Sequence, residues 1–283
     1  MIDAATIAEN VTRALEEDIG SGDRSAKLIS PDISARAELI AREDCILAGR
    51  PWAEAAFKRV SPAIRMDWQV DDGEAVPANG RIATFEGPAR ALLTAERTAI
   101  NFLQTLSATA TVTRRYVDEV EGTGVRILDT RKTLPGLRKA QKYAVATGGG
   151  HNHRMGLFDA ILVKENHILA TGSLEQAVQA ARRQPHDIPL QVEVESIAEL
   201  EAALALGVDR ILLDNFDLDQ LRTAVQTCAG RAMLEASGNI TLENVRAVAQ
   251  TGVDAISIGA LTKHVQAIDL SLRFALQPRE VQN

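Results

Sequence analysis

The chain has 283 residues, of which 46% are apolar and only 4% aromatic, so it can form one large or two moderate α/β domains around an aliphatic core. No run of about 18 apolar residues occurs, which excludes a membrane-spanning helix, and the acidic amphipathic start lacks the basic and apolar segments of a signal peptide. With a formal charge of −7 and two cysteines outside any CxxC spacing, we predict a cytoplasmic protein that binds neither membranes nor nucleic acid.

Residues 1–105 are predicted to form an N-terminal domain of helices and strands. The first 20 residues show helical periodicity, with apolar side chains recurring on one face. A partly alternating stretch at 35–48 indicates strands, and residues 51–60 indicate a helix whose Pro51 suits the first turn. Short strands separated by Asp-Asp-Gly and Asn-Gly turns are expected over residues 66–88.

Residues 106–264 are predicted to form a second domain. A helical pattern over residues 90–120, either two helices or one bent at its Ser/Thr/Ala-rich middle, leads into it. Six apolar runs then alternate with helical segments at a spacing of about 20–35 residues, a pattern typical of parallel βα units. The runs are residues 126–130, 159–166, 189–196, 210–216, 232–238 and 254–260; the helical segments are 173–183, 196–207, 218–230 and 241–252. Residues 263–276 indicate a helix followed by a strand, and the segment 265–283 is a candidate to join the N-terminal domain.

Polar residues end all six predicted strands. They are Asp129/Arg131, Lys164/Glu165, Glu193/Glu195, Asp214, Glu235/Ser237 and Ser257. In α/β barrels the active site is built at the carboxyl ends of the strands, whereas an open doubly wound sheet gathers its site at one switch point. Polar endings on every strand therefore predict an incomplete parallel α/β barrel.

The segment 126–164 reverses the charge of the protein. It holds eight Lys and Arg against two Asp, although the whole chain has 31 basic and 38 acidic residues. A solvated basic helix is the alternative interpretation. The cations lie beside strand-like runs and beside Gly148–Gly150, which allow backbone to approach a ligand closely. We therefore favour a concave site for a small polyanion, with Arg131, Lys132, His153 and Arg154 as its cage.

Two segments are candidates for binding phosphate. Residues 237–241 and 258–262 place small residues between a strand and the expected start of a helix, where backbone N–H groups bind phosphate readily. In α/β barrels the last two loops often have this role.

Glu193 and Asp214 follow consecutive strands and can share a divalent cation. Carboxylates with remaining water positions suit Mg²⁺ that carries a pyrophosphate. The alternative is a salt bridge to Lys132 or Lys164, and both interpretations can hold in an empty site.

Seven segments of the sequence carry a family resemblance. Six of them follow one another over more than 130 residues, and the seventh lies upstream. The six are 129–138 (DTRKTLPGLR), 148–167, 193–196 (EVES), 212–216 (LLDNF), 235–240 (EASGNI) and 257–262 (SIGALT), and the upstream segment is 96–104 (ERTAINFLQ). Together they resemble the quinolinate phosphoribosyltransferases, the decarboxylating nicotinate-nucleotide pyrophosphorylases of NAD biosynthesis. The resemblance implies the incomplete α/β barrel of type II phosphoribosyltransferases and an N-terminal α/β domain.

The resemblance also implies roles for individual residues. Quinolinate would be bound by Arg97, Thr130, Arg131, Lys132, His153, Arg154 and Lys164. Phosphoribosyl pyrophosphate (PRPP) would be bound by Glu193, Asp214, Ser237, Gly238, Asn239, Ser257, Ile258 and Gly259. Lys132, Lys164, Glu193 and Asp214 would be catalytic, and Glu193 and Asp214 would hold Mg²⁺ directly or through water or pyrophosphate. Arg97 would reach the pocket of a neighbouring subunit, which implies a homodimer with shared active sites.

The implied reaction joins quinolinate to PRPP and yields nicotinate mononucleotide, pyrophosphate and CO₂. One alternative is the same transfer to nicotinate, without decarboxylation. Another is a phosphate-binding barrel that forms a Schiff base through Lys132 or Lys164, as an aldolase does.

Overall fold

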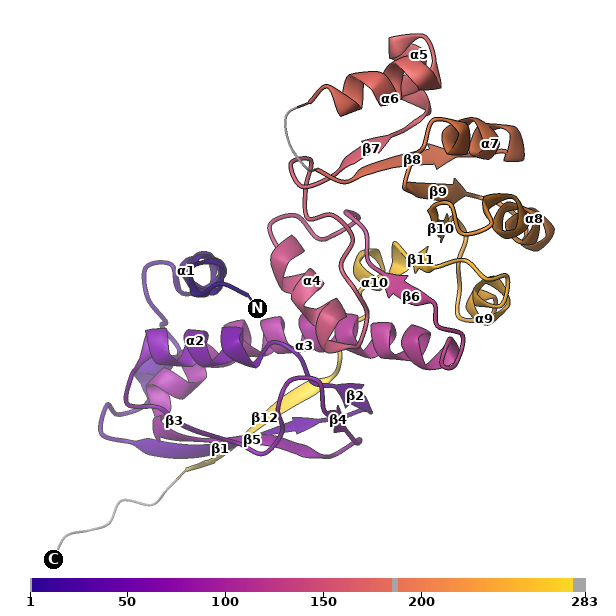
Figure 1. The fold of residues 1–283 in the computed structure, drawn as a ribbon. Coiled ribbons are helices and arrows are strands. Elements are labelled where there is room, and N and C mark those ends of the chain that lie inside the picture. The colour runs from indigo at the N-terminus through magenta and orange to yellow at the C-terminus, as the bar shows by residue number, and fades with distance from the viewer. Residues whose placement is uncertain (1, 185–187, 277–283) are drawn as a thin grey trace, which may run out of the picture. The chain divides into compact units, whose positions relative to one another are not determined.

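The computed structural model describes residues 2–184 and 188–276, which form two compact units (Figure 1). The first comprises the described part of residues 1–112, 134–149 and 264–283, and the second the described part of 113–133 and 150–263. The domain boundary at residues 105 and 106 stays a prediction. The compact units divide the chain differently, because residues 106–112 and 134–149 cluster with the first unit.

The first unit contains a four-stranded antiparallel sheet in the order β12-β1-β5-β3. Its elements are α1 (Ala4–Ile19), β1 (Ser34–Ala41), β2 (Cys45–Ile46), α2 (Arg50–Val60), β3 (Arg65–Trp68), β4 (Ala75–Val76), β5 (Arg81–Pro88), α4 (Arg138–Thr147), β12 (Leu270–Leu276) and most of α3 (Ala89–Glu119). β12 pairs with β1 from Ala41↔Leu270 to Ala35↔Leu276, so the chain returns to this sheet at its end. Residues 277–283 of the expected C-terminal segment lie outside the described residues.

The helix predicted at the start of residues 263–276 is wrong. The preceding helix, α10 (Ala260–Lys263), ends at Lys263, and no helix follows it before β12. Ile268 instead donates its backbone N–H to the Gln104 carbonyl at 3.2 Å, and its side chain is buried in the core of the first unit. Burial of this apolar side chain in extended backbone outweighs the weak local helix propensity.

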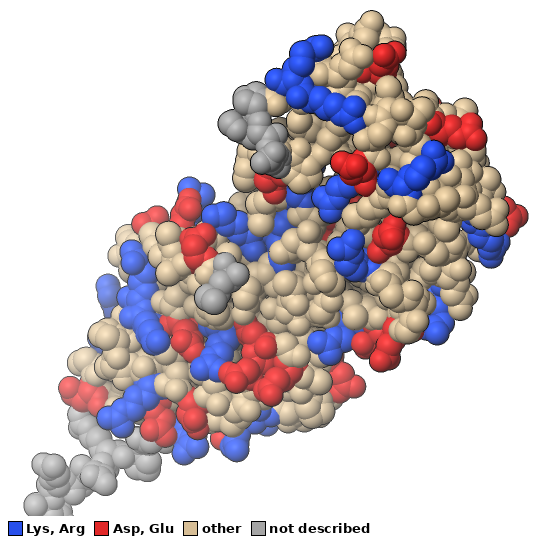
Figure 2. Space-filling model, viewed as in Figure 1, with Lys and Arg blue, Asp and Glu red and all other residues tan. Residues whose placement is uncertain are grey.

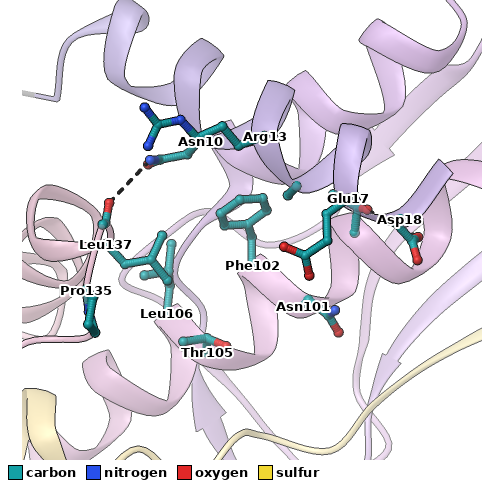
Figure 3. Close-up of a pocket in the computed structure, with 13 residues that line it drawn as sticks. Asn10, Arg13, Glu17, Asp18, Asn101, Phe102, Thr105, Leu106, Pro135 and Leu137 are labelled. Atoms are coloured by element: carbon teal, nitrogen blue, oxygen red, sulfur yellow. Dashed lines mark hydrogen bonds between the residues drawn. The ribbon is translucent and has the colours of Figure 1, made fainter. Parts of the chain in front are cut away.

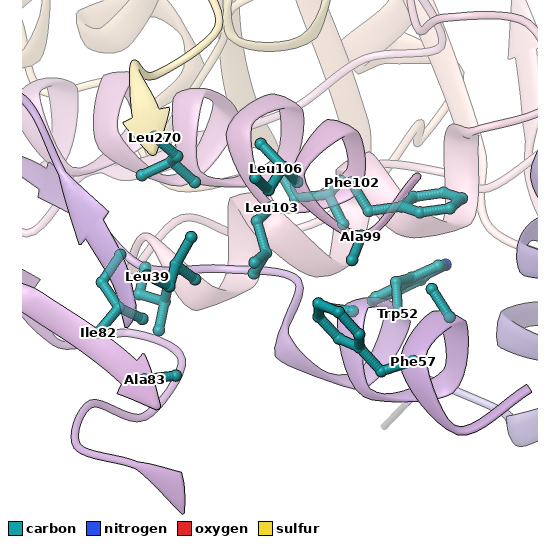
Figure 4. Close-up of a cluster of buried hydrophobic side chains, with 14 of the residues drawn as sticks. Leu39, Trp52, Phe57, Ile82, Ala83, Ala99, Phe102, Leu103, Leu106 and Leu270 are labelled. Atoms are coloured by element: carbon teal, nitrogen blue, oxygen red, sulfur yellow. The ribbon is translucent and has the colours of Figure 1, made fainter. Parts of the chain in front are cut away.

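The core of the first unit gathers side chains from the sheet, α2 and α3, including Leu39, Trp52, Phe57, Ile82 and Leu103 (Figure 4). α3 is one continuous helix, so the predicted alternative of two helices does not hold. Its Ser/Thr-rich middle is buried, and Ser107 and Thr111 accept hydrogen bonds from the backbone N–H groups of Ala48 and Ile46. These hydroxyls satisfy backbone groups beside the short strand β2 and do not interrupt the helix.

The second unit contains six parallel strands in the order β6-β11-β10-β9-β8-β7. They are β6 (Arg126–Leu128), β7 (Ile161–Val163), β8 (Leu190–Val194), β9 (Arg210–Asp214), β10 (Met233–Ser237) and β11 (Ala255–Ser257). All six coincide with the predicted apolar runs. The connecting helices are α5 (Glu165–Thr171), α6 (Leu174–Arg182), α7 (Ile197–Ala205), α8 (Leu218–Cys228), α9 (Val245–Ala249) and the short α10.

The six strands form an incomplete barrel, as predicted. His151 extends the sheet past β6 through a parallel bridge to Leu128, while β7, at the other end of the order, pairs only with β8 among the described residues. None of the described helices is both long and apolar enough to cross a membrane. On the face shown in Figure 2, Lys and Arg side chains are interspersed with Asp and Glu, so the net charge of −7 does not collect there in one acidic patch.

Candidate active site

Lys164 and Glu193 lie side by side at the carboxyl ends of β7 and β8. The register pairs Val163 with Val192, and Lys164 Nζ forms an ion pair and hydrogen bond with Glu193 Oε2. Lys164 is the last residue before α5, and its backbone N–H is capped by His167 Nδ1 at 3.0 Å. Only 13% of the Glu193 side chain is exposed, against 43% for Lys164. The structure therefore contains the expected salt bridge, which leaves the cationic head accessible beside a mostly buried carboxylate.

The next two strand ends, β9 and β10, bring Asp214 beside Ser237, Gly238 and Asn239. Asp214 is the register partner of Ser237, and its Oδ2 accepts a hydrogen bond from Asn215 Nδ2 at 2.8 Å. A Cβ atom at Gly238 would lie 2.2 Å from Asn215 Oδ1, so this turn requires glycine. The expected helix start is displaced, because α9 begins only at Val245.

At β6 and β11, Lys132 lies against Gly259. A Cβ atom built on Gly259 would lie 2.9 Å from Lys132 Cδ and 3.7 Å from both Lys132 Nζ and Thr130 Oγ1. Thr130 Oγ1 accepts the Lys132 backbone N–H at 3.0 Å, and the Thr262 hydroxyl donates to the Lys132 carbonyl at 2.9 Å. Here the helix does follow directly, because α10 begins at Ala260. Ser257 and Ile258, which precede this group, are buried.

Arg131 and Arg154 are close enough for their charges to interact. Burial lowers the pKa of the Arg154 guanidinium, the charge of Arg131 lowers it further, and Asp159 and Glu193 oppose the shift. Both arginines are partly buried. Two partly buried like charges repel each other, and an anion bound between them would relieve that repulsion.

His153 is held by a network that reaches across the barrel interior. Its Nδ1 accepts the Arg154 backbone N–H at 2.7 Å, which assigns the ring proton to Nε2. Nε2 lies 3.0 Å from Gln191 Oε1 and 3.3 Å from Glu235 Oε2, and Gln191 Nε2 donates to the same Glu235 oxygen at 2.9 Å. Both ring nitrogens are thus engaged with protein groups, and the ring orientation is fixed from both sides.

Glu235 is the buried acceptor of this network, with 2% of its surface exposed. Burial raises the pKa of its carboxyl, whereas the hydrogen bond and electrostatic attraction of His153 lower it. Hydrogen bonds from Gln191 and Ser257 act in the same direction, and the resulting pKa lies below the usual value for glutamate. Sequence reasoning did not select Gln191, although it precedes Glu193 by two residues and so lies on the same face of β8.

Replacing Glu235 with Gln is expected to destabilise the fold by about 1–3 kcal/mol at neutral pH, because the ionised acceptor is lost. A carboxyl whose pKa is lower in the folded than in the unfolded state stabilises the fold at pH values above its unfolded-state pKa. This stabilisation is lost as the pH falls through the folded-state pKa. Wild-type stability should therefore decline below about pH 4.5, the ordinary glutamate value, more steeply than that of Glu235→Gln. Urea unfolding between pH 3 and pH 7 measures the free energy of unfolding of each protein, with the exposed Glu201→Gln as the control. Parallel curves of this free energy against pH for wild type and Glu235→Gln would contradict the prediction.

Several predicted cations belong to the first unit. Arg97 is exposed on α3 in the first unit. Arg138, Lys139 and Lys142 lie on α4, also in the first unit, and Lys139 pairs with Asp3 at 3.1 Å. The alternative interpretation, a solvated basic helix, applies to Lys139 but not to Lys142, whose side chain is fully buried. Glu195, left open from sequence, is exposed beyond the end of β8.

Glu193 and Asp214 offer two carboxylates to a divalent cation. Across the described part of the chain, no group of three or more His, Cys, Asp or Glu side chains is placed to hold a metal ion. Mg²⁺ commonly binds through one or two carboxylates and keeps waters or substrate phosphates as its other ligands. The donor set fits a cation that arrives with a phosphorylated substrate.

Two cavities, one in each unit, are large enough to hold a small ligand. One of about 400 Å³ lies in the first unit between α1, α3 and residues 135–137, where Asn10 Nδ2 contacts the Gly136 carbonyl at 3.5 Å (Figure 3). None of the predicted site residues lines it. The other, of about 340 Å³, lies within the barrel unit and is lined in part by His153 and Arg154.

Comparisons with known proteins agree on one family. The model described as the C-terminal domain of quinolinate phosphoribosyl transferase matches residues 109–273, and that of the N-terminal domain matches residues 23–107. The chain is 42% identical over 271 residues to the carboxylating nicotinate-nucleotide pyrophosphorylase of Mycobacterium leprae, covering 93% of this chain and 95% of that protein. It is 40% identical over 281 residues to the decarboxylating quinolinate phosphoribosyltransferase 1b of Nicotiana tabacum, covering 92% and 80%. The solved structure of the nicotinate-nucleotide pyrophosphorylase from Francisella tularensis matches with a TM-score of 0.94 at 45% identity, covering 97% of this chain and 98% of that one.

Proposed function

The chain belongs to the quinolinate phosphoribosyltransferase family, and from this we propose that it transfers the phosphoribosyl group of PRPP to quinolinate with decarboxylation. The products are nicotinate mononucleotide, pyrophosphate and CO₂. The observation that best supports this within the structure is the neighbouring pair of partly buried arginines, Arg131 and Arg154. A guanidinium binds a carboxylate through two parallel hydrogen bonds, and a pyridine dicarboxylate needs two such anchors.

The residues at the strand ends suit the charges that develop during the transfer. As pyrophosphate leaves C1 of the ribose, the sugar becomes positively charged, and the carboxylates of Glu193 and Asp214 would stabilise it. Lys132 and Lys164 would stabilise the departing anion and the substrate carboxylates. Mg²⁺ bound with PRPP would neutralise pyrophosphate charge, with Glu193 and Asp214 as its protein ligands, directly or through water.

Decarboxylation is chemically reasonable only after the new bond forms. The ring nitrogen is then cationic, and loss of the 2-carboxylate leaves a carbanion next to that positive charge. Most of the catalysis therefore comes from orienting the two substrates for reaction and from fixed charges near the reacting atoms. His153, fixed in orientation by Gln191 and Glu235, would contribute to the wall of the quinolinate pocket.

The Schiff-base alternative is disfavoured by the contacts of Lys164. Its Nζ forms an ion pair with Glu193, and an attack on a carbonyl would have to break this contact.

Purified protein is expected to release CO₂ from quinolinate only when PRPP and Mg²⁺ are both present. Carboxyl-labelled quinolinate and trapping of the labelled gas measure this, and chelation of Mg²⁺ should remove at least about 90% of the rate if the metal neutralises pyrophosphate. Release that continues without PRPP, or nucleotide formation without CO₂, would contradict the assignment.

The homodimer with shared sites is a further part of this proposal. If Arg97 serves the pocket of a partner subunit, an inactive Arg97→Ala protein and an inactive Lys164→Ala protein should regain activity when mixed. Random exchange would give about half hybrid dimers, each with one intact site, and so roughly a quarter of wild-type activity if sites act independently. Differently tagged subunits would verify exchange. No recovery in spite of exchange would argue that Arg97 acts within its own subunit.

A further inference from the structure

The cavity of about 340 Å³ in the barrel unit opens at the amino-terminal ends of the strands. Its walls include the first residues of three strands: Arg126 of β6, Arg210 of β9 and Met233 of β10. Lys132 and Asp214, two of the proposed catalytic residues, lie at the opposite ends of β6 and β9. The cavity shares His153 and Arg154 with the proposed quinolinate pocket, whereas Arg126 and Arg210 belong to this cavity alone, and Gln191 and Glu235 also line it.

Arg126 and Arg210 bring positive charge to this cavity without a carboxylate partner. Arg210 is the register neighbour of Met233, and Arg126 Nη2 lies 3.5 Å from Met233 Sδ, a weak acceptor. Among residues 2–184 and 188–276, no carboxylate forms an ion pair with either arginine. Arg126 thus contacts Met233 from another strand, Arg210 begins the strand paired with that of Met233, and each guanidinium carries five N–H donors.

The two carboxylates that line the same cavity are engaged elsewhere. Asp159 accepts the backbone N–H groups of Met155 and Gly156 at 2.6 and 2.9 Å. Glu235 is buried against His153 and Gln191. In the described part of the chain neither forms an ion pair with Arg126 or Arg210, and the charge of Asp159 partly offsets that of Arg154, the third cation at the wall.

We propose that this cavity is a second anion site, which binds an oxyanion of the phosphate class through Arg126 and Arg210. Guanidinium groups match the geometry of phosphate oxygens, and paired arginines select for more than one negative charge. The volume exceeds that of a single phosphate, so inorganic phosphate and a phosphate monoester share the chemistry that the site would recognise. The proposal does not depend on the proposed reaction, because Arg126 and Arg210 have no role in it.

The test uses methyl-¹³C-methionine NMR of the full chain. The sequence has four methionines; Met233 contacts Arg126, whereas Met66 lies on β3 in the first unit and serves as an internal reference. Titration with inorganic phosphate, and separately with AMP, should shift the Met233 methyl resonance in a saturable way and leave Met66 unchanged. In Arg126→Gln/Arg210→Gln the apparent affinity should fall by about 100-fold, roughly tenfold for each lost charge-assisted contact. Arg222→Gln, on the exposed face of α8, should behave as wild type.

Each outcome of the titration either supports or contradicts the proposed anion site. A Met233 response to both probes supports a site for the free oxyanion, and a response to AMP alone supports a site for a phosphate ester. A Met233 signal that responds to neither probe, or that responds equally in the double variant, overturns the proposal. Lys164→Met should retain the response even if it abolishes catalysis, so failure of this proposal and failure of the proposed function are distinguishable. An unchanged Met66 resonance verifies that the variants are folded.

Discussion

Nicotinate is expected to be a very poor substrate, with a kcat/KM about 10⁴-fold below that of quinolinate. Arg131 and Arg154 lie close together and partly buried, with Lys164 at a neighbouring strand end. One carboxylate compensates only part of this charge, and a buried cation left without its partner is costly. Sites built around polar groups reject analogues that lack the matching group by about 10⁴-fold or more, which corresponds to roughly 5–6 kcal/mol.

The measurement compares kcat/KM for the two acids at saturating PRPP and Mg²⁺. Phthalate, which keeps both carboxylates but lacks the attacking nitrogen, should inhibit competitively without reacting. Arg154→Gln should lower the quinolinate rate far more than the nicotinate rate, so the discrimination ratio should shrink by at least about tenfold. Comparable kcat/KM values for both acids in the wild type would instead indicate a nicotinate enzyme.

The strands of the barrel and their polar ends could be predicted because a buried parallel strand leaves a local signal, an apolar run that ends in a polar residue. Glu193 and Asp214 were predicted in this way, and the structure places both at the carboxyl ends of adjacent strands. The network of His153, Gln191 and Glu235 was not predicted. Its partners are 38 and 44 residues apart in sequence and meet only across the interior of the barrel, which no local pattern records.

The bounds of helix α4 were not predicted, for a different reason. Two of its five buried residues, Gln141 and Lys142, are polar or charged, so its apolar periodicity is weak. Tertiary contacts stabilise this helix although its sequence pattern is weak. Tyr143 packs on Trp52 with ring centroids 5.3 Å apart and donates a hydrogen bond to Asp72 Oδ2 at 2.7 Å. Such contacts can establish a helix where propensity alone does not.

Lys164→Met and Glu193→Gln are each expected to lower kcat by about 10³-fold while changing stability by less than about 1 kcal/mol. The ion pair is partly exposed, and pairs of that kind contribute about 0.2–1 kcal/mol to folding. A positioned charge that stabilises a transition state contributes several kcal/mol to the barrier. If the pair is catalytic, the loss in rate should therefore greatly exceed the loss in stability.

The double variant Lys164→Met/Glu193→Gln separates the two roles of this pair. If the ion pair were only structural, removing both charges would leave no uncompensated group, and activity would return close to the wild-type rate. We expect the double variant to be at least as inactive as either single variant, because each charge acts on a different part of the substrates. The exposed pair Arg222 and Asp219 on α8 offers the matched control, and Arg222→Met/Asp219→Asn should leave kcat unchanged. Single-turnover rates and urea unfolding of all the variants supply both measurements, and recovery of activity in the double variant would reduce Lys164 and Glu193 to a structural contact.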